Sequence, residues 1–238
     1  MRKALRILMM LCVAGVIFTS AGALANAYDE GLMPKQPIEG TAKQPESADA
    51  SQAAFLLRYQ YPQFEAQTEA DEAINRYYQH KAEETKKMAE NGEIRCEVAH
   101  SSARYLSVRQ LLVSEGSNGF SETLSADTFA RDGMYAGQKL TLSMILGLEQ
   151  ENAESSMAEA LVYDLVWQIV HRGTENAEGD YLDGLTKEDL MRSFKPETDF
   201  YLDADGNLVF FIQSGEIAGE IAGILEFPFA PAEILSAF

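Results

Sequence analysis

The chain has 238 residues, of which 46% are hydrophobic and 10% aromatic. This composition is too apolar for a disordered chain, and the length favours one folded domain or two. The 37 acidic residues outnumber the 19 basic ones and give a formal net charge of −18, which argues against nucleic acid or an anionic membrane surface as a partner.

Residues 1–27 have the pattern of a secretory signal peptide. Three basic residues precede an uncharged stretch at 7–24, and Ala25-Asn26-Ala27 forms a small-residue cleavage site. Cleavage after Ala27 would leave 16 basic and 37 acidic residues, a net charge of −21. The alternative is an uncleaved anchor, because residues 7–25 come close to the ~20 residues that span a bilayer. We expect a secreted or envelope-associated protein, with membrane contact only if this segment is retained.

Residues 28–50 contain three prolines, two glycines and few large apolar side chains. This composition predicts a flexible linker, so that the folded domain would cover residues 51–238. The domain contains one cysteine, Cys96, in a stretch of alternating polarity. A lone cysteine forms no internal disulfide, and we interpret it as a buried thiol that acts as a small hydrophobic side chain.

The domain is predicted to begin with a strand and a helix. Residues 55–61 have a strand pattern that Pro62 ends. Thr68 followed by Asp71 is typical of a helix N-terminus, and the helix is predicted to run from Glu69 to about Asn91, where Asn91-Gly92 supplies a stop signal.

Three strands are predicted next. Ile94, Cys96 and Val98 alternate with Arg95, Glu97 and Ala99, so the two sets should face opposite sides of a sheet. Residues 105–113 and 120–129 have the same alternation on either side of Asn118-Gly119, which is a strong turn signal.

The C-terminal half is predicted to mix helices with short strands. An apolar helix covers Met157 to Ile169 and ends at Gly173, and Thr186 begins a short helix that runs through Phe194. A hairpin at 200–212 turns at Asp203–Asn207, an edge strand follows at 223–229, and a last helical turn follows at 231–235. This order indicates an α+β fold with an antiparallel sheet packed by about two long helices and one short helix.

Three sequence blocks resemble the extracytoplasmic domain of RsiV-type anti-sigma factors, which is shared with the N-terminal region of the peptidoglycan deacetylase PdaC. The blocks are Tyr61-Pro62 with Ala73-Ile74-Asn75; Gly137 to Leu142; and a long C-terminal block. The third block comprises Asp199 to Leu202, Asp205-Gly206, Leu208 to Phe211, Glu216 to Ala218, Ala222 to Ile224 and Glu226-Phe227.

The resemblance implies an exported bacterial α+β domain tied to the cell envelope, which in RsiV-like proteins is a receptor for C-type lysozyme. Only Met1 to Arg6 precede the apolar stretch, so we expect no sigma-factor partner. The family often has a Gly-Gly-Ala-His segment where this chain has Ser114 to Gly119 without histidine. From the third block and its surroundings we take four candidate ligand-binding residues: Tyr201, Glu216, Glu220 and Glu226.

No cofactor, metal site or catalytic residue is predicted. The three histidines form no zinc pattern. Asp203, Asp205 and Asn207 imitate the start of a calcium loop, but the spacing that follows fits a hairpin turn better.

The sequence therefore favours an exported, non-catalytic binding or sensing module of the cell envelope. A basic extracellular protein such as a C-type lysozyme suits its acidic charge, and peptidoglycan is the other candidate partner. The alternative is a cell-wall glycan hydrolase with two carboxyl groups about 5–10 Å apart, one with a raised pKa. A structural subunit with a large exposed apolar patch is a third hypothesis.

Overall fold

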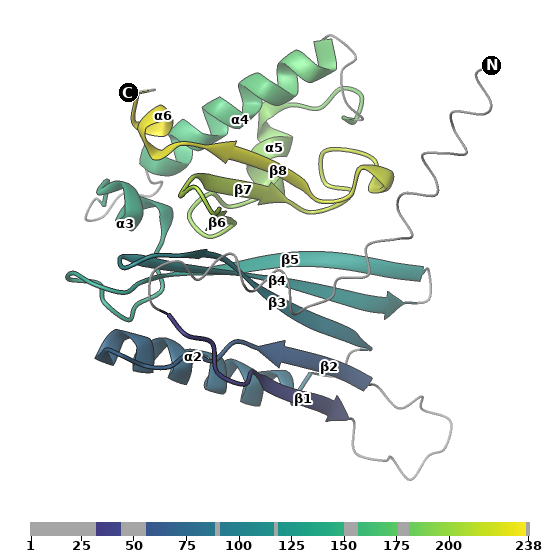
Figure 1. The fold of residues 1–238 in the computed structure, drawn as a ribbon. Coiled ribbons are helices and arrows are strands. Elements are labelled where there is room, and N and C mark those ends of the chain that lie inside the picture. Colours follow the sequence, from purple (N-terminus) through teal and green to yellow (C-terminus); the bar gives the residue numbers. More distant parts are fainter. Residues whose placement is uncertain are drawn as a thin grey trace, which may run out of the picture.

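The computed structural model describes residues 32–43, 56–88, 91–116, 119–149, 157–175 and 181–236. They form four layers (Figure 1): a helix, a five-stranded sheet, a three-stranded sheet and a second layer of helices. This confirms the predicted α+β fold and shows that its strands form two sheets. The predicted signal peptide lies outside the described residues.

The larger sheet has the order β1-β2-β3-β4-β5. Its strands are β1 (Ile38–Lys43), β2 (Leu56–Tyr61), β3 (Gly92–Ser101), β4 (Tyr105–Gly116) and β5 (Gly119–Ala130). Strands β2 and β3 are parallel, which their helical connection permits, and the other neighbours are antiparallel. Strands β4 and β5 are twelve residues each and form the longest pair.

Helix α2 (Glu69–Thr85) covers one face of this sheet. Its N-terminus is the predicted one: the Thr68 hydroxyl accepts the Asp71 N–H, and the Asp71 carboxylate accepts the Thr68 N–H. The helix ends before the predicted Asn91. The Thr85 hydroxyl bonds the carbonyl of Lys81 and the hydroxyl of Tyr61, which fixes the helix end on β2. The side chain of Asn91 instead accepts the N–H of Leu56, at 2.7 Å.

The smaller sheet covers the opposite face of the larger one. It has the order β6-β7-β8 and is antiparallel throughout, with β6 (Phe200–Leu202), β7 (Leu208–Ile212) and β8 (Leu225–Phe229). All five residues of β7 are buried, because this strand is covered on both faces. The sheets meet in an apolar cluster of Leu124, Ala126, Tyr201, Val209 and Phe211.

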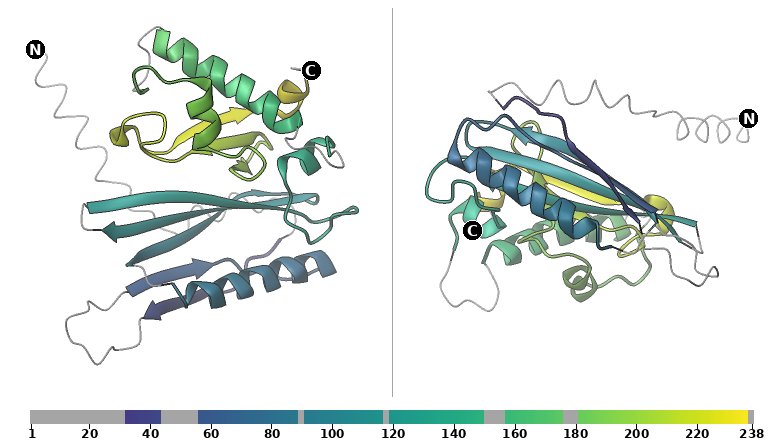
Figure 2. Two further views of the ribbon diagram at one scale, coloured as in Figure 1. Left: turned by 180° about the vertical axis from the view of Figure 1, so that it is seen from behind. Right: turned by 90° about the horizontal axis from the view of Figure 1, so that it is seen from below.

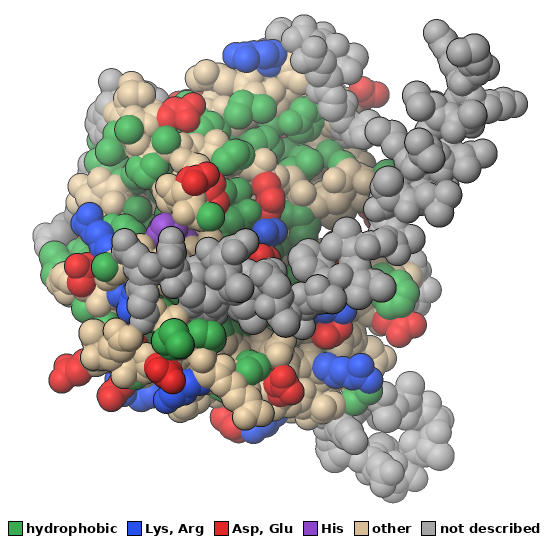
Figure 3. Space-filling model, in the orientation of Figure 1, with side chains coloured by type: hydrophobic (Ala, Val, Ile, Leu, Met, Phe, Trp, Pro, Cys, Tyr) green, Lys and Arg blue, Asp and Glu red, His purple; other side chains and the backbone are tan. Residues whose placement is uncertain are grey.

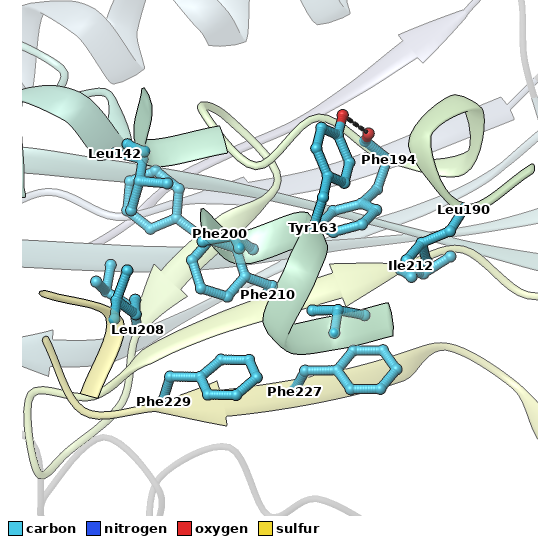
Figure 4. Close-up of a cluster of buried hydrophobic side chains, with 14 of the residues drawn as sticks. Leu142, Tyr163, Leu190, Phe194, Phe200, Leu208, Phe210, Ile212, Phe227 and Phe229 are labelled. Carbon is cyan, nitrogen blue, oxygen red and sulfur yellow. Dashed lines mark hydrogen bonds between the residues drawn. The ribbon is translucent and has the colours of Figure 1, made fainter. Parts of the chain in front are cut away.

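The outer face of the smaller sheet packs against helices. They are α4 (Met157–Glu175), α5 (Lys187–Ser193) and α6 (Pro231–Ser236). Figure 4 shows the aromatic rings of Phe200, Phe210, Phe227 and Phe229 in this core. The hydroxyl of Tyr163 donates to the carbonyl of Phe194 at 2.9 Å, which ties α4 to the end of α5.

The structure differs from the expected elements at three further places. Residues 38–43 were assigned to the linker, but they form β1, and Leu32 and Ala42 nearby are buried. Helix α3 (Leu142–Leu146) was not predicted; Thr141 caps it and Gly147 ends it with φ +67°. Helix α4 continues past Gly173, which is buried within the helix.

The helices of the described residues include none that is long and apolar enough to cross a membrane.

One buried carboxylate ties α2 to the sheet. The Asp127 side chain, on β5, is 1% exposed and lies 2.9 Å from Lys81 Nζ and 2.5 Å from Lys139 Nζ. The Tyr77 hydroxyl and the Gln110 amide also donate to it. Burial alone would raise the pKa of Asp127, but the two lysines outweigh it and the pKa is lowered. Cys96 faces the same core, and burial raises the pKa of its thiol.

Replacing Gly40 should weaken the pairing of β1 with β2. A Cβ at this position would lie 2.0 Å from the hydroxyl oxygen of Tyr59, whose ring is buried. We expect Gly40→Ala to lower the free energy of unfolding by about 1–3 kcal/mol in urea denaturation. Gly219→Ala is the control, since no atom lies within 4 Å of its Cβ and its φ is −60°. Equal stability of the two variants would contradict the described contact.

Replacing Asp127 should destabilise the protein in a pH-dependent way. We expect Asp127→Asn to cost about 3 kcal/mol at pH 7, because Lys81 and Lys139 lose their buried counter-charge. The lowered pKa means that this stabilisation is present above the unfolded-state pKa of about 3.9 and is lost as pH falls through the folded-state pKa.

The difference between wild type and Asp127→Asn in urea denaturation should therefore narrow in acid. The exposed Asp132→Asn is the control and should leave stability unchanged at every pH. A difference that stays constant or widens between pH 7 and acid would contradict the assigned role of Asp127.

Candidate functional site

The smaller sheet leaves one end of the larger sheet uncovered. Strands β6, β7 and β8 have three, five and five residues, whereas β4 and β5 have twelve each. The β4–β5 hairpin therefore extends past the smaller sheet (Figure 2). We call the uncovered face at the hairpin end, on the side opposite α2, the open end. The pairing register of the strands and the alternation of side chains along them show which residues share this face. They are Glu93 and Arg95 of β3, Leu111, Val113 and Glu115 of β4, and Phe120 and Glu122 of β5.

A polar cluster borders the open end where the two sheets meet. Arg109 Nη2, from β4, donates to Glu226 Oε1 of β8 at 2.8 Å, and the Tyr201 hydroxyl of β6 donates to the same oxygen at 3.0 Å. The guanidinium of Arg109 lies 4.7 Å from the centre of the Tyr201 ring. Glu97 Oε2, on β3, is 4.0 Å from Arg109 Nη1. One arginine thus joins two carboxylates and an aromatic ring from both sheets.

Burial and neighbouring charges determine the charge states of the ionisable side chains in this region. Burial raises the pKa of Tyr201; Arg109 opposes the rise and Glu226 adds to it. Tyr201 therefore stays a neutral donor to Glu226. At the open end, the hydrogen bond from Arg95 lowers the pKa of Glu93, and the two charges offset each other.

The segment between β7 and β8 lies beside the open end. The side-chain amide of Gln213 donates to the carbonyl of Leu124 at 2.8 Å and accepts its N–H at 3.0 Å, so it occupies part of the free edge of β5. Gly215 and Gly223 have φ of +82° and +69°, a backbone that favours glycine. Between them lies the 3₁₀ turn η2 (Glu220–Ala222), at the same end of the molecule as the hairpin tip (Figures 1 and 2).

The structure places the four predicted ligand-binding residues in two groups. Tyr201 and Glu226 meet in the polar cluster. Glu216 and Glu220 are exposed in the segment that carries η2, and neither forms an ion pair with another described residue. The alternation at 94–99 predicted that Glu97 lies on the face opposite Cys96, but Arg109 was not predicted. Its bond to Glu226 joins residues 117 positions apart, and no local sequence pattern reports such a contact.

Three carboxyl groups of the described residues have a lowered pKa. A hydrogen bond from Arg95 lowers the pKa of Glu93, Lys81 and Lys139 lower that of Asp127, and hydrogen bonds from Thr186 lower that of Asp189. Asp203 holds the β6–β7 hairpin turn by accepting the N–H groups of Asp205 and Asn207, as the hairpin interpretation predicted. The part of the chain that the structure describes holds no group of three potential metal ligands.

Charge and apolar surface are unevenly spread over the face in Figure 3. Hydrophobic side chains gather over the smaller sheet and α4, whereas charged side chains of both signs gather over α2, β1 and β2. At the far end of the β4–β5 hairpin a hydrophobic side chain stands next to acidic ones.

Comparison with known proteins finds similarity in structure only. No protein-family model matches the chain, and no curated protein matches it in sequence. A solved structure of a DUF3298 family protein from Pseudomonas aeruginosa PAO1 is 12% identical, with a TM-score of 0.50 over 88% of this chain and 94% of that one. A member of the same family from Bacteroides fragilis, also 12% identical, gives a TM-score of 0.48 over 87% and 98%. At this identity the Pseudomonas structure shows a shared fold alone, that of a bacterial domain of unknown function.

Proposed function

We propose that the chain is an exported, non-catalytic binding module of the bacterial cell envelope whose ligand is a basic protein. The main support for this proposal is the charge around the open end. Glu115, Glu216 and Glu220 are exposed there, and within the described residues none of them has an ion-pair partner; the exposed Glu122 shares the charge of Arg95 with Glu93. Glu97 and Glu226 share the single cation of Arg109. A ligand with lysine or arginine side chains would supply the missing counter-charges.

The charge of the whole chain supports the same ligand class. A net charge of −18, or −21 after removal of residues 1–27, repels anionic surfaces and speeds encounters with basic proteins. The signal-peptide pattern and the resemblance to RsiV-type and PdaC-type domains support an extracytoplasmic location. A C-type lysozyme is the natural probe because it is basic and is the ligand of the RsiV-like proteins.

The proposal predicts salt-sensitive binding to a basic C-type lysozyme. Titration calorimetry at low and at about 150 mM salt should show micromolar or tighter binding that weakens as salt rises, because the Debye length shortens to about 8 Å. Lysozyme succinylated on its lysines keeps its size but loses its positive charge, and it should not bind. Absence of binding to native lysozyme at micromolar concentration would refute this ligand, and binding to peptidoglycan fragments instead would identify the other partner class.

A matched pair of variants tests the assignment to the open end. Glu216→Gln combined with Glu220→Gln should weaken lysozyme binding about three- to tenfold. Asp132→Asn combined with Glu233→Gln removes the same charge from exposed positions in other parts of the chain and should have little effect. Equal weakening by both pairs would indicate attraction by net charge alone and contradict the proposed surface.

A further inference from the structure

Two large apolar side chains stand exposed near the open end. Phe120, next to the tip of the β4–β5 hairpin, is 78% exposed, and Ile221, on η2, is fully exposed. No other aromatic side chain among the described residues is exposed. Exposed apolar groups of this size are typical of an interaction surface.

The backbone geometry places Phe120 and η2 on the same side of the sheet. Phe120 and Leu124 are four residues apart on β5 and therefore share a face. Leu124 is held there by the amide of Gln213, and Ile224 packs into the same apolar cluster. Gln213 and Ile224 flank the segment that carries Ile221, so η2 stands beside the face from which Phe120 projects.

Two apolar side chains of β4 form a strip on the same face of the sheet as Phe120. Leu111 and Val113 of β4 share this face and are partly buried. Around the strip lie the exposed carboxylates of Glu115, Glu122, Glu216 and Glu220, while Glu93 is offset by Arg95. The arrangement is an apolar centre with a polar rim, which is the usual anatomy of a protein–protein interface.

We infer that Phe120 and Ile221 are the apolar anchors of an interface at the open end, and that its occupant is a basic protein with an apolar patch framed by lysine or arginine. The inference rests on the proposed function and adds the side chains that supply the affinity. Charge complementarity selects the occupant: a second copy of this chain would bring the same acidic rim against this one, and like charges across an interface repel.

Alanine substitutions test the anchors, with C-type lysozyme as the probe. Phe120→Ala and Ile221→Ala should each weaken binding by about fivefold or more, since anchors at the centre of an interface dominate its energy. Met134→Ala is the control, because this side chain is 81% exposed in the loop that follows the other end of β5. It should leave affinity unchanged. All three side chains are exposed, so thermal unfolding should also be unchanged, which separates lost binding from lost folding.

Each outcome decides between the two proposals. In one outcome, wild type binds lysozyme and the variant with Glu216→Gln and Glu220→Gln binds it more weakly. If Phe120→Ala and Ile221→Ala then bind as tightly as wild type, the anchors are refuted and the proposed function stands. The anchors are also refuted if Met134→Ala weakens binding as much as the anchor variants do. If wild type does not bind lysozyme at all, the proposed ligand and the anchors are both refuted.

Discussion

The packing of a small sheet on one face of a larger one determines the rest of this structure. A sheet with two apolar faces must be covered on both, and here α2 covers one face and strands β6, β7 and β8 cover the other. Polar contacts fix the orientation of the two sheets. The N–H of Leu202 donates to the hydroxyl of Ser107 at 3.0 Å, that hydroxyl also bonds the hydroxyl of Thr128, and His100 Nδ1 lies 2.8 Å from the carbonyl oxygen of Asp203.

The difference in strand length between the sheets leaves part of the larger sheet exposed. The short strands of the smaller sheet cover β4 and β5 only in part, and the uncovered remainder forms the open end. The segment from Gln213 to Ile224 then serves two purposes, because it closes part of the β5 edge and places Glu216, Glu220 and Ile221 beside the open end. Acidic and apolar groups therefore gather where no other described residue covers them, and this supports the proposed binding of a basic protein.

The sequence predicted the features that depend on neighbouring residues. The alternation at 94–99, the caps at Thr68 and Thr186, and the turn at Asp203 are all local signals, and the structure has each of them. Strand β1 was missed because its residues include glycine and lie among prolines; its pairing depends on the distant Tyr59. The polar cluster was predicted only in part, since Tyr201 and Glu226 were named but Arg109, their shared partner, lies far away in the sequence.

Hydrogen exchange in the presence and absence of a basic C-type lysozyme tests the central claim most directly, because it locates the contact without any substitution. Bound lysozyme should slow amide exchange in residues 109–116, 119–124 and 213–226, which belong to the open end, its border and the segment beside it, and should leave α2 unchanged. Slowed exchange confined to α2 or to α4, with the open end unchanged, would contradict the assignment of this surface as the binding site.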